Sequence, residues 1–178
     1  MHWFRRARPG PPSWNLAKTT VQIVAFWGVF LFIVPPWLVD QSARLGVSAI
    51  PSPAGRVVAV LLFAAASVLG LSSAFSMAVK GEGTPLPLDA PRNLVVAGPY
   101  RWVRNPMVIA GLAQGAAIAL WHGSIAVGAY VIMGGLLWHA VVHPREEADL
   151  AHTFGAEFQA YRQRVPLWLP RRPESPDR

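Results

Sequence analysis

Apolar and charged positions alternate along this chain in long blocks. Twenty-one residues without formal charge lie between Lys18 and Asp40, 23 lie between Arg56 and Lys80, and 40 lie between Arg104 and Arg145. A helix that crosses the hydrocarbon core of a bilayer, about 30 Å thick, needs about 20 apolar residues. The first two runs each fit one span, and the third fits two short spans joined by a tight turn at residues 121–124.

This pattern predicts an all-α integral membrane protein with four transmembrane helices and a C-terminal amphipathic helix. We expect a single domain over residues 1–178. Its spans are expected at about residues 17–34, 55–79, 106–121 and 125–143, and its cytoplasmic amphipathic helix at about residues 145–164.

Proline marks the expected ends of these helices. Pro35 and Pro36 are expected to end the first span, because proline lacks the backbone N–H that a helix interior needs. Pro106 suits the first turn of the third span. Pro144 is expected to start the amphipathic helix, which lies on the membrane or over the mouth of the bundle. Its apolar positions recur at helical spacing, at Leu150, Phe154, Phe158 and Tyr161.

Three further segments are predicted to be irregular. Residues 1–15 form a basic, proline-containing arm, and residues 171–178 form a disordered end. Residues 80–97 are rich in glycine and proline, so we expect a loop that is either disordered or functional.

Charge sets the expected orientation. With four spans and a cytoplasmic N-terminus, 14 of the 16 Lys and Arg residues fall on the cytoplasmic side, and only Arg44 and Arg56 fall outside. This is the positive-inside bias. We therefore expect both termini in the cytoplasm, at a bacterial inner membrane. The net charge of +7 then indicates contact with anionic lipid head groups rather than with nucleic acid.

Composition agrees with a membrane protein and excludes sites that need cysteine. Apolar residues make up 53% of the chain and charged residues 14%, against about 25% charged in soluble domains. No cysteine is present, which excludes disulfides, thiolate metal sites and a cysteine nucleophile.

Two polar clusters could carry chemistry. Arg101 and Arg104 stand just before the third span, where they could anchor it to lipid phosphates or clamp a carboxylate or phosphate ligand. Glu146 and Glu147 could complement the dipole of a helix that starts at Pro144. The hairpin of the third and fourth spans could also return them to a position opposite the arginines.

His139 and His143 raise the question of a metal site. They stand four residues apart and share a helix face, so with Glu146 or Glu147 they could bind zinc. Pro144 disturbs the register between the histidines and the glutamates. We therefore predict no metal site.

These residues resemble a known family. The matching positions are Gly98-Pro99-Tyr100-Arg101, Arg104-Asn105-Pro106, Glu146-Glu147, Leu150, Phe154-Gly155, Tyr161 and Val165-Pro166. Their order is similar to that of the isoprenylcysteine carboxyl methyltransferase and phospholipid methyltransferase family, whose members are integral-membrane enzymes that use S-adenosylmethionine. The resemblance covers roughly residues 80 to 170.

The resemblance implies a cytoplasmic cofactor pocket and sideways entry of a lipophilic substrate from the bilayer. The residues that it places at the cofactor are Tyr100, Arg101, Asn105, Pro106, Glu146 and Glu147. Arg104 and Glu147 are the candidates for substrate or catalytic roles.

The sequence departs from the family pattern at three positions. Asn105 stands where many members have histidine, Val108 where tyrosine is common, and Leu167 where arginine is common. The match therefore implies neither a prenylcysteine carboxylate nor a phospholipid amine as the substrate.

We accordingly expect an S-adenosylmethionine-dependent membrane methyltransferase that acts on a lipophilic or amphipathic small molecule with a carboxylate, amine or hydroxyl acceptor. Two alternatives stay open: an NADPH-dependent membrane reductase, and a non-enzymatic helical membrane protein. The sequence does not determine the oligomeric state.

Overall fold

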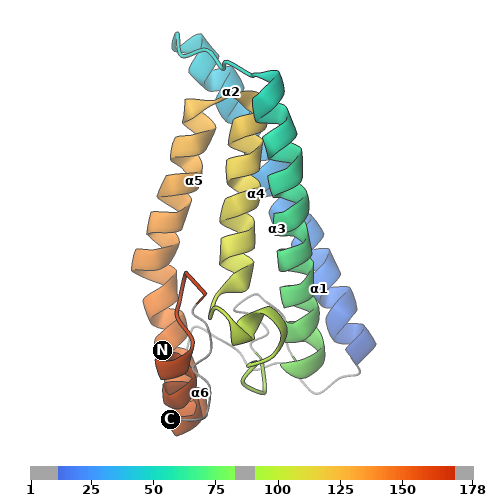
Figure 1. The fold of residues 1–178 in the computed structure, drawn as a ribbon, viewed down its shortest axis with the longest axis vertical. Helices are drawn as coiled ribbons and strands as arrows, with labels where there is room; N and C mark the ends of the chain where they lie inside the picture. Colours follow the sequence, from blue (N-terminus) through green and yellow to red (C-terminus); the bar gives the residue numbers. More distant parts are fainter. Residues whose placement is uncertain (1–11, 83–90, 171–178) are drawn as a thin grey trace.

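The computed structural model of this chain describes residues 12–82 and 91–170 (Figure 1). The elements in chain order are α1 (Pro12–Trp27), the π-helical segment η1 (Gly28–Ile33), α2 (Val34–Arg44), α3 (Pro53–Lys80), the 3-10 turn η3 (Gly98–Arg101), α4 (Pro106–His122), α5 (Ile125–Leu137), the π-helical segment η4 (Trp138–Val142) and α6 (His143–Arg164). No strand occurs in these two ranges, and the predicted all-α fold is confirmed. The predicted C-terminal disorder, most of the basic arm and the middle of the 80–97 loop lie outside the described residues.

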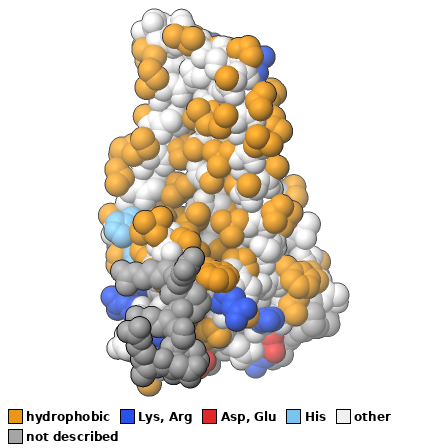
Figure 2. Space-filling view, viewed as in Figure 1, with side chains coloured by type: hydrophobic (Ala, Val, Ile, Leu, Met, Phe, Trp, Pro, Cys, Tyr) orange, Lys and Arg blue, Asp and Glu red, His pale blue; other side chains and the backbone are white. Residues whose placement is uncertain are grey.

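Three helices in the described ranges are long and apolar enough to cross a membrane: Ser13–Arg44, Pro53–Lys80 and Ile125–Arg164. The helix α4 is also apolar but has 17 residues, or about 25 Å at 1.5 Å per residue. The predicted count of four spans therefore stays a prediction. Figure 2 shows hydrophobic side chains over the upper and middle parts of the visible face, as expected for a surface that meets lipid rather than water, whereas most charged side chains in view lie in its lower part.

The first helix does not end at Pro35 and Pro36, so that prediction was wrong. The helix continues from Ser13 to Arg44, and η1 ends at Ile33, two residues before Pro35. A proline ring clashes with the carbonyl group four residues earlier in a regular α-helix. A π-helical turn widens the backbone at this point and changes the hydrogen-bond register, which lets the helix pass the prolines.

The same arrangement occurs before Pro144. The segment η4 joins α5 to α6, and the helix runs on where a new start was predicted. The predicted amphipathic helix is instead broken at Gly155, which has φ 51° and ψ −124°. Its apolar positions form a cluster in which Phe158, Tyr161 and Val165 are buried and Leu94, Leu150, Ala151 and Phe154 pack around them. The predicted apolar face therefore packs inside the protein.

The hairpin between α4 and α5 turns where the sequence predicts. The turn residue Gly123 has φ 61°, and its N–H donates to the carbonyl groups of Ala119 and Leu120. Ser124 caps α5 by accepting a hydrogen bond from the N–H of Val127. This turn puts α4 between α3 and α5, and it brings α6 to the same end of the column as η3 (Figure 1).

Small residues let these helices approach closely. A Cβ atom on Gly115 would lie 2.7 Å from the side chain of Val131, and one on Gly135 would lie 3.2 Å from that of Leu112. Because apolar burial alone does not drive helix association in lipid, such close contacts account for much of the packing.

Candidate functional site

The hairpin brings Arg104 and Glu147 into direct contact. A guanidinium nitrogen of Arg104 donates to the carboxylate of Glu147, 43 residues further along the chain. Both side chains are largely buried, with 13% and 14% of their surface exposed. The two polar clusters that the sequence singled out therefore meet at one end of the helical column.

Glu147 also has two other neighbours. The Nε atom of Arg162 lies 3.3 Å from one carboxylate oxygen, and Nε2 of His143 lies 3.7 Å from the other. A carboxylate that lies between two guanidinium groups is oriented by both of them. Its clearest structural role is to fix the position of Arg104.

Among the described residues, a buried donor of Arg104 has no partner. Its Nε atom is buried, and within the described residues it has no hydrogen-bond partner; the same holds for Nδ1 of His143. Since buried polar atoms are almost always paired, these two atoms mark places where a ligand could form a hydrogen bond. Nε of Arg104 can only donate, whereas Nδ1 of a neutral imidazole donates or accepts according to the tautomer.

The backbone around Arg104 is fixed by the C-terminal segment. Its N–H donates to the carbonyl of Pro166 at 2.9 Å. The hydroxyl of Tyr161 donates to the carbonyl of Tyr100 at 2.7 Å, and both tyrosines are buried. The helix α3 leaves no room for a side chain at Gly98, because a Cβ atom there would lie 2.4 Å from Oγ of Ser76. The Gly98–Arg101 turn is thus packed between α3 and the end of α6.

Glu146 differs from its neighbour. It is partly buried, and its carboxylate makes no ion pair or hydrogen bond to any other described residue. Burial raises the pKa of Glu146 to about 7, and the nearby charge of Glu147 adds to the shift. Burial also raises the pKa of the Tyr100 phenol, and the charge of Glu146 contributes, so the two groups share one desolvated region.

The other predicted site residues lie around this pair in different ways. Pro106 is buried at the start of α4, and Asn105 precedes it without a side-chain capping hydrogen bond. Arg101 is exposed and has no ion-pair partner among the residues that the structure describes. Arg101 and Arg104 thus differ in burial, and a joint clamp on one ligand stays a prediction.

Aromatic rings pack beside Glu147. The imidazole of His143 stacks on the ring of Trp138 at 5.2 Å and on that of His139 at 5.6 Å, and Trp168 packs edge-on against Trp138 at 5.5 Å. In residues 12–82 and 91–170, no group of three His, Cys, Asp or Glu side chains is placed to bind a metal ion. The two histidines belong instead to this aromatic cluster.

Sequence reasoning missed Arg162 and the contact of His143 with Glu147. Arg162 follows the break at Gly155, so helical spacing counted from Glu147 does not show that the two side chains meet. Only the change of chain direction at Gly155 makes this contact possible.

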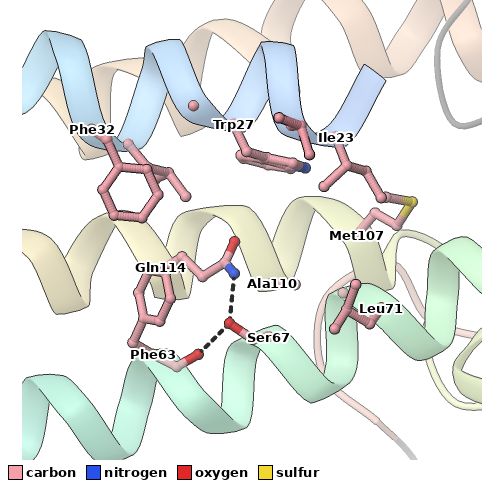
Figure 3. A pocket seen from close by; sticks show the side chains of 13 residues that line it. Ile23, Trp27, Phe32, Phe63, Ser67, Leu71, Met107, Ala110 and Gln114 are labelled. Atoms are coloured by element: carbon pink, nitrogen blue, oxygen red, sulfur yellow. Dashed lines mark hydrogen bonds between the residues drawn. The ribbon is translucent and has the colours of Figure 1, made fainter. Parts of the chain in front are cut away.

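A cavity of about 380 Å³ lies among the helices (Figure 3). It is bounded by α1 with η1, by α3 and by α4, and its lining is almost entirely apolar. Met107, one of the lining residues, comes three positions after Arg104. The cavity therefore starts close to the polar cluster and extends along the helices.

Comparison with known proteins identifies a family. The family model described as phospholipid methyltransferase matches residues 54–157, more than half of the chain. The matched segment includes α3, α4, α5 and the ion pair of Arg104 with Glu147. No curated protein and no solved structure matches the chain.

Proposed function

The chain belongs to the phospholipid methyltransferase family, and from this membership we propose that it is a membrane enzyme that transfers a methyl group from S-adenosylmethionine to a lipophilic or amphipathic small molecule. The family and the apolar helices make it an integral membrane methyltransferase. The cofactor, the substrate class and the residue roles below are the proposed part.

The observation that carries the proposal is a buried cationic donor on Arg104 in the same cluster as the carboxylate of Glu146. Arg104 is held by Glu147 and keeps a buried Nε–H free, while the adjacent Glu146 has no cationic partner among the described residues. S-adenosylmethionine carries a carboxylate together with an ammonium and a sulfonium group. The free donor of Arg104 fits the carboxylate, and the unpaired carboxylate of Glu146 fits a cationic group.

When bound, S-adenosylmethionine supplies an activated methyl group for a single displacement. Such a reaction depends mainly on alignment of the two reactants. Arg104, fixed by Glu147 and by the backbone contact to Pro166, provides a rigid anchor for this alignment. Tyr100, Asn105 and Pro106 shape the wall next to that anchor.

The two glutamates would have different roles. Glu147 already accepts a hydrogen bond from Arg104 and forms an ion pair with Arg162, so we assign it to positioning. Glu146 has no such partner, and its pKa of about 7 suits proton removal from an amine or hydroxyl acceptor near neutral pH. A carboxylate acceptor would need no base.

An NADPH-dependent reductase fits this site less well. The cofactor of such an enzyme brings several phosphate charges, which need free cationic side chains. Arg104 and Arg162, the arginines in this cluster, both pair with Glu147, and Glu146 adds a further negative group. The site therefore favours a cationic cofactor.

Calorimetry on detergent-purified protein tests the proposal. We expect heat on addition of S-adenosylmethionine and S-adenosylhomocysteine and none with NADPH. Glu146→Gln should weaken S-adenosylmethionine binding by about tenfold or more, because hydrogen bonds to charged groups contribute about 1.5–3 kcal/mol. Glu157→Gln is the matched control, because Glu157 is exposed on the same helix.

Each outcome separates the candidate functions. Binding of NADPH alone would support the reductase. A folded protein that binds none of the three compounds would support the non-enzymatic alternative, in which the arginines and glutamates serve only topology and packing.

A further inference from the structure

The apolar cavity contains one polar feature that a plain lipid-binding groove does not need. Among its 13 lining residues, the indole N–H of Trp27 is one hydrogen-bonding group. The other polar side chains of the lining are Ser67 on α3 and Gln114 on α4. These two side chains are hydrogen-bonded to each other at 2.9 Å across the helix pair (Figure 3).

The orientation of the Gln114 amide follows from this hydrogen-bond chain. The hydroxyl of Ser67 donates its single hydrogen to the carbonyl of Phe63 at 2.7 Å. Ser67 can therefore only accept from Gln114, which must turn its NH₂ group towards Ser67. In Figure 3 the amide oxygen of Gln114 accordingly points away from Ser67, towards the side of α1 and the cavity.

This oxygen is an unused acceptor in apolar surroundings. None of the described residues donates a hydrogen bond to it. A polar group without a partner in such surroundings is unfavourable, so a ligand that supplies an O–H or N–H is favoured over one that does not. The acyl chain of an ordinary membrane lipid has no such donor.

We propose that this cavity binds the lipophilic part of the methyl-accepting substrate, and that this part carries a hydrogen-bond donor, such as a hydroxyl, that contacts the amide oxygen of Gln114. The proposal rests on the proposed function, because it takes the occupant to be the substrate. It narrows the substrate class to chain-like lipophiles with a second polar group.

The geometry gives the separation of the two polar groups. Gln114 lies eight residues beyond Pro106 on α4, which corresponds to about 12 Å along the helix axis. The polar cluster with Arg104 lies just before Pro106. The hydrogen-bond donor of the substrate should therefore lie about 12–15 Å from the end of the substrate that reaches Arg104.

Two glycines define how the cavity can be altered. A Cβ atom on Gly111 would lie 2.0 Å from the ring of Trp27, so Trp27 fits its wall position only because residue 111 is glycine. A Cβ atom on Gly28, another lining residue, would meet no atom within 4 Å. A larger side chain at Gly28 therefore starts in open space at the cavity wall.

The test compares a twelve-carbon fatty acid that carries a terminal hydroxyl with the same acid without it. Binding to the detergent-purified full chain is measured by equilibrium dialysis with labelled probes. The hydroxylated probe should bind about five- to tenfold more tightly, as expected for one net hydrogen bond in apolar surroundings. Gln114→Met, which keeps the side-chain volume, should make the two probes equal.

A matched pair of glycine variants locates the probe. Gly28→Leu should weaken both probes by about tenfold or more, because it fills the cavity. Gly134→Leu makes the same change on α5, where the Cβ atom would also meet nothing within 4 Å, and should leave both affinities unchanged. Equal binding of the two probes to the wild type, or no binding of either, would overturn the proposal.

Binding of S-adenosylhomocysteine to the same samples separates this inference from the proposed function. A hydroxyl preference that depends on Gln114, in protein that does not bind S-adenosylhomocysteine, would support the ligand chemistry of the cavity and overturn its assignment to a methyltransferase substrate. Cofactor binding without the hydroxyl preference would overturn only the inference about the cavity.

Discussion

Glu146 and Glu147 are neighbours in sequence but have different surroundings. Glu147 pairs with Arg104 and Arg162, whereas Glu146 has no ionic partner within the described ranges. The contrast arises because successive helical residues point about 100° apart, so only one of them faces the arginines. Of these two glutamates, Glu147 can thus anchor the structure, while Glu146 can bind a ligand.

The raised pKa of Glu146 predicts a pH dependence of cofactor binding. Its pKa of about 7 lies above the usual value of 4.5, so the side chain is protonated below about pH 7 and ionised above it. S-adenosylmethionine binding should therefore tighten severalfold between about pH 6 and pH 8. By the same linkage, the free energy of unfolding falls as the pH rises from about 4.5 to about 7, because the folded state holds this proton more tightly.

Calorimetry across this pH range checks the prediction in the wild type and in Glu146→Gln. The variant should show no step near pH 7. Of the groups that face Glu146, Glu147 is paired with Arg104, and burial raises the pKa of the Tyr100 phenol, which stays neutral. An equal step in the variant would assign the titration to another group.

At the scale of elements, two helices pass prolines by means of π-helical segments. The segments η1 and η4 each end two residues before a proline, Pro35 and Pro144, and each connects two α-helical parts into one long helix. The second of these matters for the site, since it continues α5 into α6 and so sets where Glu147 meets Arg104. The wider π turn is therefore part of how the polar cluster is built.

The α4–α5 hairpin depends on Gly123. Its φ is 61°, and a Cβ atom there would lie 2.1 Å from the carbonyl oxygen of Ile50, whose N–H donates to the carbonyl of Gly123 at 2.9 Å. Gly123→Ala should lower the free energy of unfolding by about 2–4 kcal/mol, because it adds a backbone clash to a left-handed conformation. Thermal unfolding in detergent measures the loss.

The control for this variant is Gly128→Ala. Gly128 lies within α5, where a Cβ atom would meet no atom within 4 Å. Alanine should be neutral there or stabilise by up to about 1 kcal/mol through its helix propensity. Similar destabilisation by both changes would show that the turn geometry at Gly123 is not the cause.

At the scale of the whole molecule, charge is distributed unevenly between the two ends. The polar cluster of Arg104, Glu147 and Arg162 lies at the end where α1 begins and where α6 lies (Figure 1). The two basic residues predicted for the other side have local partners: Arg44 pairs with Asp40 at 2.9 Å, and the guanidinium of Arg56 lies 5.4 Å from the Trp121 ring centre. Their charges therefore conflict little with the positive-inside bias.

This distribution predicts a cytoplasmic C-terminus. In a bacterial host, a fluorescent protein fused after Arg178 should be fluorescent, and alkaline phosphatase fused there should be inactive. Alkaline phosphatase inserted in the loop of residues 45–52 should be active. The reverse pattern would contradict the proposed orientation and would place the Arg104 cluster outside the cell.

The lengths and chemistry of the segments were predictable, whereas several of their ends were not. The turn at residues 121–124 and the face-to-face placement of Arg104 and Glu147 follow from charge-free runs and from hairpin topology, and both are confirmed. Passage through Pro35 and Pro144 was not predicted, because a π-helical turn depends on the backbone of the preceding residues rather than on a distinctive residue pattern.

The sequence by itself determined that this chain is helical, apolar enough for a membrane and equipped with two polar clusters at one end, because these properties depend on residue type and order. Only the tertiary structure decided which side chains meet. Three features depend on how separate helices are rotated and broken: the contact of Arg162 with Glu147, the lack of a cationic partner for Glu146 among the described residues, and the Gln114 oxygen that faces the cavity. Side-chain contacts between distant segments depend on these rotations, which linear spacing does not encode.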